Sequence, residues 1–376
     1  MFYWVKEILD KEGWKDFLSV PEQVYRDDPN WVQPLSSEIR RVLNPAKNPY
    51  FANAVLKLFV CYSANKPIGR AILVINRLHW TVWHKKSSFF GFFEAIDDVC
   101  AVKSLFERIE TESRNLGAEY LEGPFNPNHY SELGILMDHF TVPPLFFETY
   151  NPPYYKQLLE EIGFTELCRL HTRINTEIAA TLSKEIKFSQ LNQANQDIMI
   201  RKFNGWRLKR ELDIMREINN DAFEKNWYFL PLTRKEYTFS AKFLFFVTSP
   251  GLILIAEHKG QPVGVLQLAI NFNSLVRHIH GSIRFWNIPR LLCGKKKVKE
   301  LVIFTFGVKK AYQHTRVAAL MIAPALRIIQ RYASVSSTWM SEENKSVIRF
   351  SALVGMKPYK HFGIFSKPLT IRQTDA

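Results

Sequence analysis

The sequence predicts an α/β fold, with a mixed sheet flanked by helices, that is present twice in the chain. The first observation is a repeat, because Lys66–Asn76 (KPIGRAILVIN) returns as Gln261–Asn271 (QPVGVLQLAIN), 195 positions later. Each copy follows another apolar run across a few polar residues, which is typical of a β-hairpin. The second observation is a pair of short helical segments, Tyr154–Phe164 and Asn344–Met356, each with a glycine expected to end the helix. A repeat of this length indicates a duplicated domain.

The length of 376 residues agrees with two domains that each bury a core. We predict an N-terminal domain at 1–177 and a C-terminal domain at 197–376. Residues 178–196 are polar, with Ser, Asn and Gln and little periodicity, which is typical of a linker.

The first domain is expected to contain a hairpin, a strand, a helix, a strand, a long loop, a helix and a strand. Asp97 and Asp98 are expected to cap the first helix, whose apolar residues recur at helical spacing. The long loop is rich in Gly, Pro and Asn. The expected elements are the hairpin 56–76, strand 89–96, strand 119–122, loop 123–153 and helix 154–162.

The second domain is expected to repeat this order. A basic insert that contains tryptophan, residues 277–299, separates its hairpin from the next strand. Strands that precede helices around a mixed sheet indicate α/β or α+β architecture. The expected elements are strand 198–203, helix 207–223, hairpin 252–272, strand 300–308, helix 318–332, strand 336–340, helix 346–354 and strand 361–365.

Cysteine usage and hydropathy predict a cytoplasmic protein. The four cysteines are far apart with no CxxC spacing, so neither a disulfide framework nor a zinc site is predicted. The first residues lack the pattern of a signal peptide, and no run approaches the roughly 18 apolar residues of a spanning helix. His278 and His280 share a strand face without a third ligand at suitable spacing, so we predict no metal.

The net charge of +14 is concentrated in the second half of the chain. Residues 1–177 contain 19 Lys and Arg against 23 Asp and Glu, whereas residues 178–376 contain 31 against 13. A basic surface attracts the phosphates of CoA, anionic lipid headgroups or RNA, and it can also serve only solubility. Charge alone does not choose among these.

The order of elements resembles the GNAT acyltransferase fold, and the resemblance covers both halves. Four segments are more narrowly similar to the bacterial YghO-like family of tandem GNAT proteins. The resemblance implies an acyltransferase that uses acyl-CoA, either acetyl-CoA or a longer chain. These segments are Asn48–Phe51, Phe90–Glu94, Gly123–Asn126 and Tyr150–Tyr155.

GNAT enzymes hold the pyrophosphate of CoA on backbone N–H groups where a strand turns into a helix, commonly with Gln/Arg-x-x-Gly-x-Gly/Ala. Residues 313–318 (QHTRVA) occupy that place in the second domain, with Arg316 in place of the first glycine. In the first domain Asp97 and Asp98 would repel phosphate, so we predict that its CoA site is degenerate. The predicted CoA-binding residues are Phe306, Val308, Gln313, His314, Arg316, Val317, Ala318 and Asn344.

Acyl transfer to an amine needs a base for the ammonium and an acid for the thiolate. Glu94 follows an apolar aromatic run, so burial is expected to raise its pKa, whereas Glu300 is expected to pair with nearby lysines. Strand-end exposure, turn formation and helix-dipole effects remain alternative explanations for these residues. The predicted catalytic residues are Glu94, Tyr154, Tyr155 and Glu343, and the predicted substrate-binding residues are Asn126, Asn151 and Trp339.

Three functions remain open from the sequence. The first is an N-acyltransferase with a lipid-like amine acceptor, since the insert 277–299 combines basic and apolar residues as a peripheral membrane segment does. The second is a transferase that uses aminoacyl-tRNA, because the Fem-like ligases are similar in layout. The third is a non-catalytic binding protein in which both CoA sites have decayed.

Overall fold

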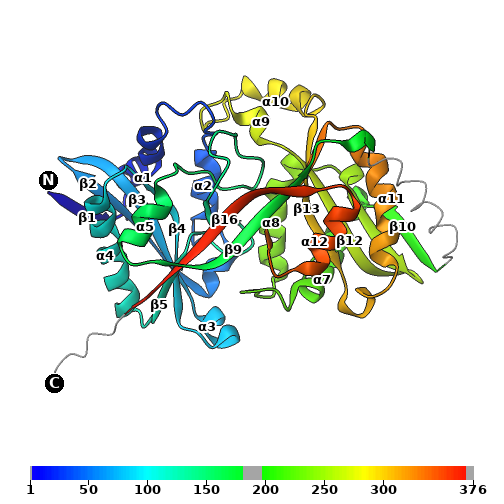
Figure 1. The fold of residues 1–376 in the computed structure, drawn as a ribbon, viewed down its shortest axis with the longest axis horizontal. Coiled ribbons are helices and arrows are strands. Elements are labelled where there is room, and N and C mark those ends of the chain that lie inside the picture. Colours follow the sequence, from blue (N-terminus) through cyan, green and yellow to red (C-terminus); the bar gives the residue numbers. More distant parts are fainter. Residues whose placement is uncertain (1, 181–196, 370–376) are drawn as a thin grey trace. The chain divides into compact units, whose positions relative to one another are not determined.

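The computed structural model describes residues 2–180 and 197–369 and divides the chain into two compact units (Figure 1). The N-terminal unit consists of Met1–Leu170, Ile279–Ile283 and Lys360–Ala376. The C-terminal unit consists of His171–His278 and Arg284–Tyr359. Most of the expected linker, residues 181–196, lies outside the described residues.

The N-terminal unit is a mixed sheet with strand order β1-β2-β3-β4-β5-β16. Neighbouring strands are antiparallel except for β4 and β5, which are parallel. The elements are β1 (Tyr3–Glu7), α1 (Lys11–Val24), α2 (Ser36–Val42), β2 (Ala54–Ser63), β3 (Lys66–Asn76), α3 (Arg77–Trp83), β4 (Ser87–Ala95), α4 (Val99–Asn115), β5 (Tyr120–Gly123), β6 (Phe125–Asn126), β7 (Glu132–Leu133), β8 (Ile135–Leu136), α5 (Tyr155–Glu161), β9 (Thr165–Asn175) and β16 (Lys357–Pro368).

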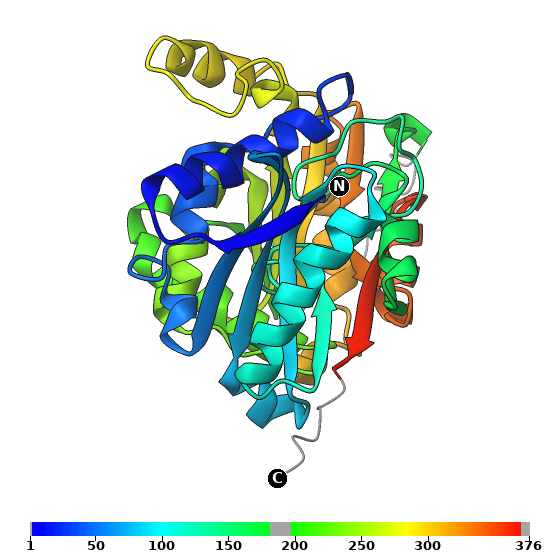
Figure 2. The same cartoon turned by 90° about the vertical axis from the view of Figure 1, so that its left-hand side faces the viewer.

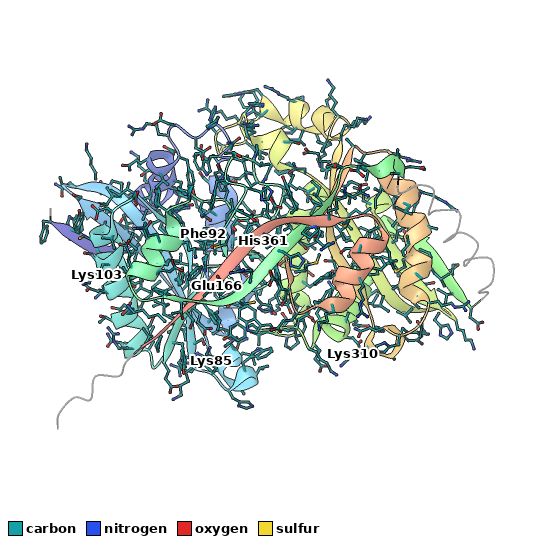
Figure 3. All side chains as sticks on the ribbon, in the orientation of Figure 1. Lys85, Phe92, Lys103, Glu166, Lys310 and His361 are labelled. Atoms are coloured by element: carbon teal, nitrogen blue, oxygen red, sulfur yellow. The ribbon has the colours of Figure 1, made fainter. Side chains whose placement is uncertain are left out.

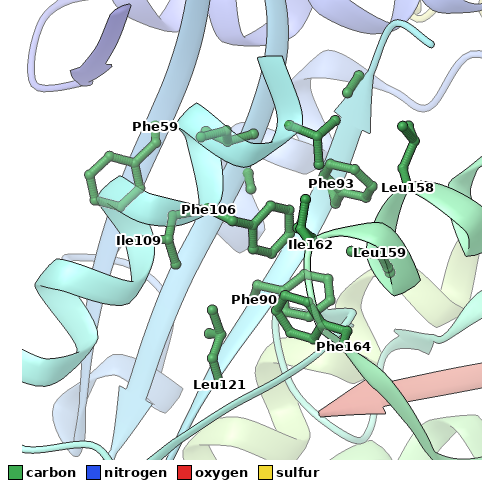
Figure 4. Packing of buried hydrophobic residues seen from close by; sticks show 14 of the residues in the cluster. Phe59, Phe90, Phe93, Phe106, Ile109, Leu121, Leu158, Leu159, Ile162 and Phe164 are labelled. Carbon is green, nitrogen blue, oxygen red and sulfur yellow. The ribbon is translucent and has the colours of Figure 1, made fainter. Parts of the chain in front are cut away.

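Helices α1 and α4 cover opposite faces of this sheet. The guanidinium of Arg70 on β3 donates to the carbonyl oxygen of Phe17 in α1, whereas Cys61 on β2 faces the carbonyl of Ala101 in α4. Because side chains alternate along a strand, each strand supplies apolar residues to both faces. Figure 2 shows α4, in cyan, lying along the strands. The core on the α4 side is aromatic, with Phe90, Phe93, Phe106 and Phe164 in edge-to-face contact (Figure 4).

The C-terminal unit has strand order β14-β13-β12-β11-β10, with the end of β9 beside β14. Here β13 and β14 are the parallel pair. The elements are β10 (Ile198–Lys202), α7 (Leu208–Phe223), α8 (Arg234–Val247), β11 (Ile253–His258), β12 (Gln261–Ile270), α9 (Asn273–Val276), α10 (Asn287–Lys295), β13 (Glu300–Val308), α11 (Val317–Ile329), β14 (Ser334–Ser337), β15 (Met340–Ser341) and α12 (Lys345–Leu353).

The repeated sequence forms the same hairpin in both units. The pairing of β2 with β3 shifts after Cys61, which faces Gly69, and the pairing of β11 with β12 shifts after Ala256, which faces Gly264. Both pairs are therefore related by the 195-residue offset of the repeat. This shared bulge confirms the duplication at the level of backbone register.

The two expected glycine stops are also confirmed. Gly163 follows α5 with φ +92°, and Gly355 follows α12 with φ +78°. Glycine adopts this left-handed conformation without the steric cost that a Cβ would bring.

Several elements differ from the sequence prediction. Strand β1, helix α1 and helix α8 were not predicted, and α1 contains Pro21 within a helical stretch. The basic insert, residues 277–299, contains the short helix α10, and the short helix α9 precedes it. In the part of the chain that the structure describes, no helix is long and apolar enough to cross a membrane.

Strand β16 contributes to the N-terminal unit from Lys360 onward. It pairs with β5 from the Phe365–Gly123 pair to the Pro368–Tyr120 pair. Lys360, which is 0% exposed, donates to the carboxylate of Glu148 at 2.8 Å and to the carbonyl oxygen of Pro143 at 3.0 Å. A buried ammonium requires such partners, so this pair ties the strand to the unit.

Candidate functional site

The strand-to-helix turn of the C-terminal unit begins where β13 separates from β14. Their parallel register runs from Glu300–Ser334 to Ile303–Ser337 and ends there, while β13 stays paired with β12 as far as Val308. The separated part of β13 includes Phe306, whose ring stacks on Phe350 of α12 at 4.1 Å. Phe306 and Val308 therefore lie on the stretch of β13 that continues beyond its parallel neighbour.

Residues 313–316 connect this strand to α11 and are exposed. Gln313 donates through Nε2 to the carbonyl oxygen of Val308 at 3.2 Å, so its side chain closes the turn. Arg316 is the N-cap of α11 and its own side chain makes no capping bond, while the hydroxyl of Thr315 accepts from the N–H of Val317 at 3.4 Å. The first turn of α11 contains no acidic residue. A helix start without a carboxylate cap presents backbone N–H groups and the positive end of the helix dipole to an anion. His314 is exposed beside it, whereas Val317 is buried.

Lys310, labelled in Figure 3, lies just before this turn, and its positive charge is already paired. Its ammonium pairs with Glu224, and its backbone N–H donates to the carboxylate of Asp221 at 2.6 Å. Arg316, the N-cap residue, is a basic residue at the start of α11.

The corresponding turn of the N-terminal unit is closed by its own carboxylate. Asp98 is the N-cap of α4, and one of its oxygens accepts from the backbone N–H groups of Cys100 at 2.9 Å and Ala101 at 3.0 Å. Its other oxygen accepts from the hydroxyl of Tyr3 at 2.5 Å. Burial opposes the charge, but these hydrogen bonds bring the pKa of Asp98 below its usual value. The predicted acidic cap is thus confirmed, and an anion would meet a carboxylate here.

The strand separation in the N-terminal unit is also filled by the chain itself. The parallel register of β4 and β5 ends at the Phe89–Glu122 pair. Beyond it, the side-chain oxygen of Asn126 accepts from the backbone N–H of Phe92 at 2.6 Å. A Cβ at Gly91 would collide with the carbonyl oxygen of Phe125, so only glycine allows this approach. Asn126 therefore binds β4, where it satisfies a backbone donor.

Glu94, at the end of β4, forms the centre of a buried polar cluster. Its Oε2 atom accepts from the hydroxyls of Tyr25 and Tyr155, each at 2.7 Å. Its Oε1 atom lies 3.8 Å from the guanidinium of Arg70. The Glu94 side chain is 15% exposed and that of Arg70 is 3% exposed. Tyr154 completes the group, because its hydroxyl donates to the carbonyl oxygen of Ala95 at 2.8 Å.

The cluster, defined here as the Glu94 cluster (Glu94, Tyr25, Tyr155, Arg70 and Tyr154), has opposing electrostatic effects. Burial raises the pKa of Glu94, and Arg70 with the two tyrosine hydroxyls opposes that rise. Burial also raises the pKa values of Tyr25 and Tyr155 well above the usual value, so both hydroxyls keep their protons. The carboxylate of Glu94 thus accepts hydrogen bonds from two hydroxyls, those of Tyr25 and Tyr155, that stay protonated.

The remaining predicted site residues have local roles in the structure. Asn151 is buried and binds the backbone of Leu136, accepting from its N–H at 2.6 Å and donating to its carbonyl oxygen at 3.3 Å. Asn344 caps α12 by accepting from the N–H of Val347 at 3.3 Å. Glu343 is exposed before that cap, and Trp339 lies between β14 and β15. Glu300 accepts from Asn271 at 2.5 Å, an amide instead of the expected lysine.

Sequence reasoning missed Tyr25 and Arg70, which complete the Glu94 cluster. Arg70 stands inside an otherwise apolar strand, a local signal that a buried charge needs a partner. Sequence reasoning also missed Glu132 on β7, which lies opposite Asn126 of β6. Burial, with the nearby carboxylate of Glu38, raises the pKa of Glu132 to about 7. No sequence pattern marks that environment.

Register shows that the two units differ at the position of Glu94. In the N-terminal unit Arg70 faces Glu94 one step beyond the Gly69–Ala95 pair. In the C-terminal unit Val265 faces Gly307 one step beyond the Gly264–Val308 pair. A Cβ at Gly307 would lie 3.2 Å from the Cβ of Ala222, so a side chain there would be in tight contact with α7. Within the described residues, no three His, Cys, Asp or Glu side chains are grouped to hold a metal ion.

Comparison with known proteins places these features in context. No family model matches the sequence. The chain is 28% identical over 373 residues to protein YghO of Escherichia coli strain K12, covering 97% of this chain and 95% of that protein. It is 28% identical over 367 residues to the bacterial ceramide synthase of Caulobacter vibrioides, covering 94% of each.

Solved structures show the fold. A tandem GNAT protein from the clavulanic acid biosynthesis pathway is 10% identical, covers 99% of this chain and 100% of its own, and has a TM-score of 0.58. A GCN5-related N-acetyltransferase from Sphaerobacter thermophilus is 10% identical, covers 98% and 96%, and has a TM-score of 0.53. The chain is therefore a tandem GNAT-fold protein that resembles YghO and bacterial ceramide synthase over nearly its whole length. The tandem GNAT fold and the similarity to YghO confirm the sequence prediction.

Proposed function

We propose that this protein is an N-acyltransferase that moves an acyl group from acyl-CoA to the amine of a long-chain, sphingoid-like lipid. The observation that carries the proposal is the whole-length similarity to a bacterial ceramide synthase on a tandem GNAT fold. A GNAT fold alone would leave the substrate open, because one fold supports many acceptors. The name of the relative supports a lipid amine.

We assign the acyl-CoA to the C-terminal unit. The separated end of β13, with Phe306 and Val308, would lie along the pantetheine arm, and the start of α11 would bind the pyrophosphate through Val317 and Ala318. The exposed turn before α11, the absence of an acidic residue from the first turn of α11 and the charge of Arg316 support this assignment. Gln313 closes the turn and shapes it, while His314 and Asn344 remain proposed contacts.

We assign the amine to the N-terminal unit, where the Glu94 cluster offers a carboxylate to an ammonium group. Asp98 and Asn126 already occupy the two features by which a GNAT domain would bind CoA. We therefore assign the amine acceptor, and not CoA, to the N-terminal unit. The protons retained by Tyr154 and Tyr155 make these residues candidate donors.

The reaction forms an amide N–C bond and breaks the thioester C–S bond. The ammonium must first lose a proton, for which Glu94 is the proposed acceptor, and the departing thiolate takes up a proton to give free CoA. A carboxylate with a raised pKa suits this role, because its basicity lies closer to neutral pH than that of an exposed carboxylate.

The proposal is tested with the full chain, a C16 acyl-CoA, acetyl-CoA and sphinganine, with mass spectrometry of the amide and a thiol assay for free CoA. We expect one equivalent of amide for each equivalent of CoA released. N-acetylated sphinganine, which lacks the free amine, is expected to release none. Amide formed only when aminoacyl-tRNA replaces acyl-CoA, or CoA binding without any amide formation, would overturn the proposal.

A further inference from the structure

The part of the basic insert that belongs to the C-terminal unit, from Arg284 to Lys299, exposes apolar side chains on helix α10 and in the turn before it. Helix α10 contains no buried residue. The exposed fractions are 77% for Phe285, 56% for Trp286 and 59% for Leu292. Large apolar side chains that gather at this exposure mark an interaction site. Figure 1 shows α10 in yellow.

The geometry of α10 separates an inner face from an outer face. Gly294 lies on the inner face, where a Cβ would come within 2.8 Å of the Leu275 side chain, so α9 packs closely against α10 there. Ile288 and Leu292 are four residues apart in α10, which places them on one side of the helix, and Phe285 lies in the turn just before it. All three are exposed. The apolar row therefore lies on the side away from α9.

The surroundings of this row are uniformly basic. Residues 273–299 contain seven Lys and Arg and neither Asp nor Glu. Arg284, Arg290 and the run Lys296–Lys297 are exposed next to the apolar row, and the guanidinium of Arg284 lies over the ring of Trp286 at 5.3 Å. A protein partner would commonly bring mixed charges, whereas this surface complements a uniformly anionic one.

We propose that the basic insert docks the protein on an anionic membrane surface, with Phe285, Ile288 and Leu292 inserted at the headgroup boundary. Apolar and aromatic side chains on one face with flanking Lys and Arg are what an interfacial helix requires. Each basic residue near an anionic leaflet adds attraction that salt weakens. Docking on a membrane would give the protein access to a lipid acceptor. The evidence for docking is the surface of the basic insert, which does not depend on the proposed reaction.

The test is sedimentation of the full chain with vesicles in the absence of CoA. We expect binding to vesicles of phosphatidylcholine with 30% phosphatidylglycerol, and at least tenfold weaker binding to phosphatidylcholine alone. The F285S/I288S/L292S variant and the R290E/K296E/K297E variant should each lose at least tenfold in partition coefficient. A matched L9S/K103E variant, which changes exposed residues of the N-terminal unit, should bind as the parent does.

Circular dichroism verifies that the variants remain folded, which is expected because all the changed side chains are exposed. Equal binding of the parent and both insert variants would overturn the proposal. So would equal binding to neutral and anionic vesicles, a salt-sensitive complex with RNA without vesicle binding, or a concentration-dependent dimer that the serine variant abolishes without vesicle binding. Because no acyl-CoA is present, failure here leaves the test of the reaction unaffected.

Discussion

The two strand-to-helix turns of this protein come from one duplicated sequence and have opposite electrostatics. In the N-terminal unit Asp98 accepts hydrogen bonds from the first N–H groups of α4. In the C-terminal unit α11 starts at Arg316 without a carboxylate cap, and the neutral hydroxyl of Thr315 accepts from the N–H of Val317. A helix start attracts a negative group, and a carboxylate in the chain and a phosphate of a ligand compete for it. A carboxylate of the chain can thus occupy the helix start that would otherwise be open to an anion, and the fold stays the same.

The two units also differ at the position of Glu94. Glu94 lies on β4 of the N-terminal unit, and the equivalent position on β13 of the C-terminal unit is Gly307. The buried carboxylate and the helix start without a carboxylate cap are thus found in different copies. We interpret this as a division of roles after duplication, with the amine assigned to one unit and acyl-CoA to the other.

The largest expected effect is the loss of activity when the carboxylate of Glu94 is removed. Glu94→Gln should lower kcat by about 10² to 10⁴-fold, the usual contribution of a general base, while the Kd for acyl-CoA stays within twofold. Steady-state kinetics and calorimetry measure the two quantities. As pH falls through the raised pKa of Glu94, activity of the parent should be lost, because the protonated carboxyl accepts no proton.

The matched control for Glu94→Gln is Glu257→Gln in the C-terminal unit, where Glu257 pairs with Arg201 at 2.7 Å. This variant also breaks an ion pair, so it should change thermal stability without changing kcat. Equal losses of activity in both variants would assign Glu94 a purely structural role.

The next effect concerns the helix start of the C-terminal unit. Arg316→Glu should weaken acyl-CoA binding by about 10 to 100-fold, because it puts a carboxylate beside the start of α11. Calorimetry with the full chain measures the Kd. Asp98→Asn is the matched variant in the other unit, since Asn caps as well as Asp but has no charge. It should leave the Kd and the stoichiometry unchanged, and a second equivalent of bound CoA would break the comparison.

The smallest effect concerns the loop that fills the strand opening of the N-terminal unit. Burial raises the pKa of Glu132 from 4.5 to about 7, so the folded protein binds a proton that the unfolded chain releases between these pH values. Stability therefore decreases as pH rises through this window, and the penalty is complete above pH 7. Glu132→Gln should match the parent near pH 4 and exceed its free energy of unfolding by roughly 1 to 3 kcal/mol at pH 8.

Urea unfolding at the two pH values measures this difference. Glu107→Gln, at an exposed position of α4, is the control and should change stability equally little at both. A Glu132 variant that is destabilised at pH 8 would show that the charged form is the one the fold favours.

Local features of this protein were accessible from its sequence. The repeated hairpin, the Asp98 cap and the glycines after α5 and α12 depend on periodicity and on residues close in the chain. These determinants act over a few residues, so a pattern suffices to find them. The tandem fold, and Glu94, Tyr154 and Tyr155 as separate candidate residues, followed from such patterns and from the family resemblance.

Only the tertiary structure decided which groups surround Glu94. Tyr25 follows α1, Arg70 lies on β3 and Tyr155 begins α5, so the cluster depends on how distant segments pack. The same holds for Asn126, whose amide could serve a substrate or a turn until Phe92 is placed beside it. Burial and long-range contact set the charge and the partner of each group, and neither is encoded in local spacing. The sequence by itself therefore determined the duplicated fold, and the packing decided which of its polar residues remain available for chemistry.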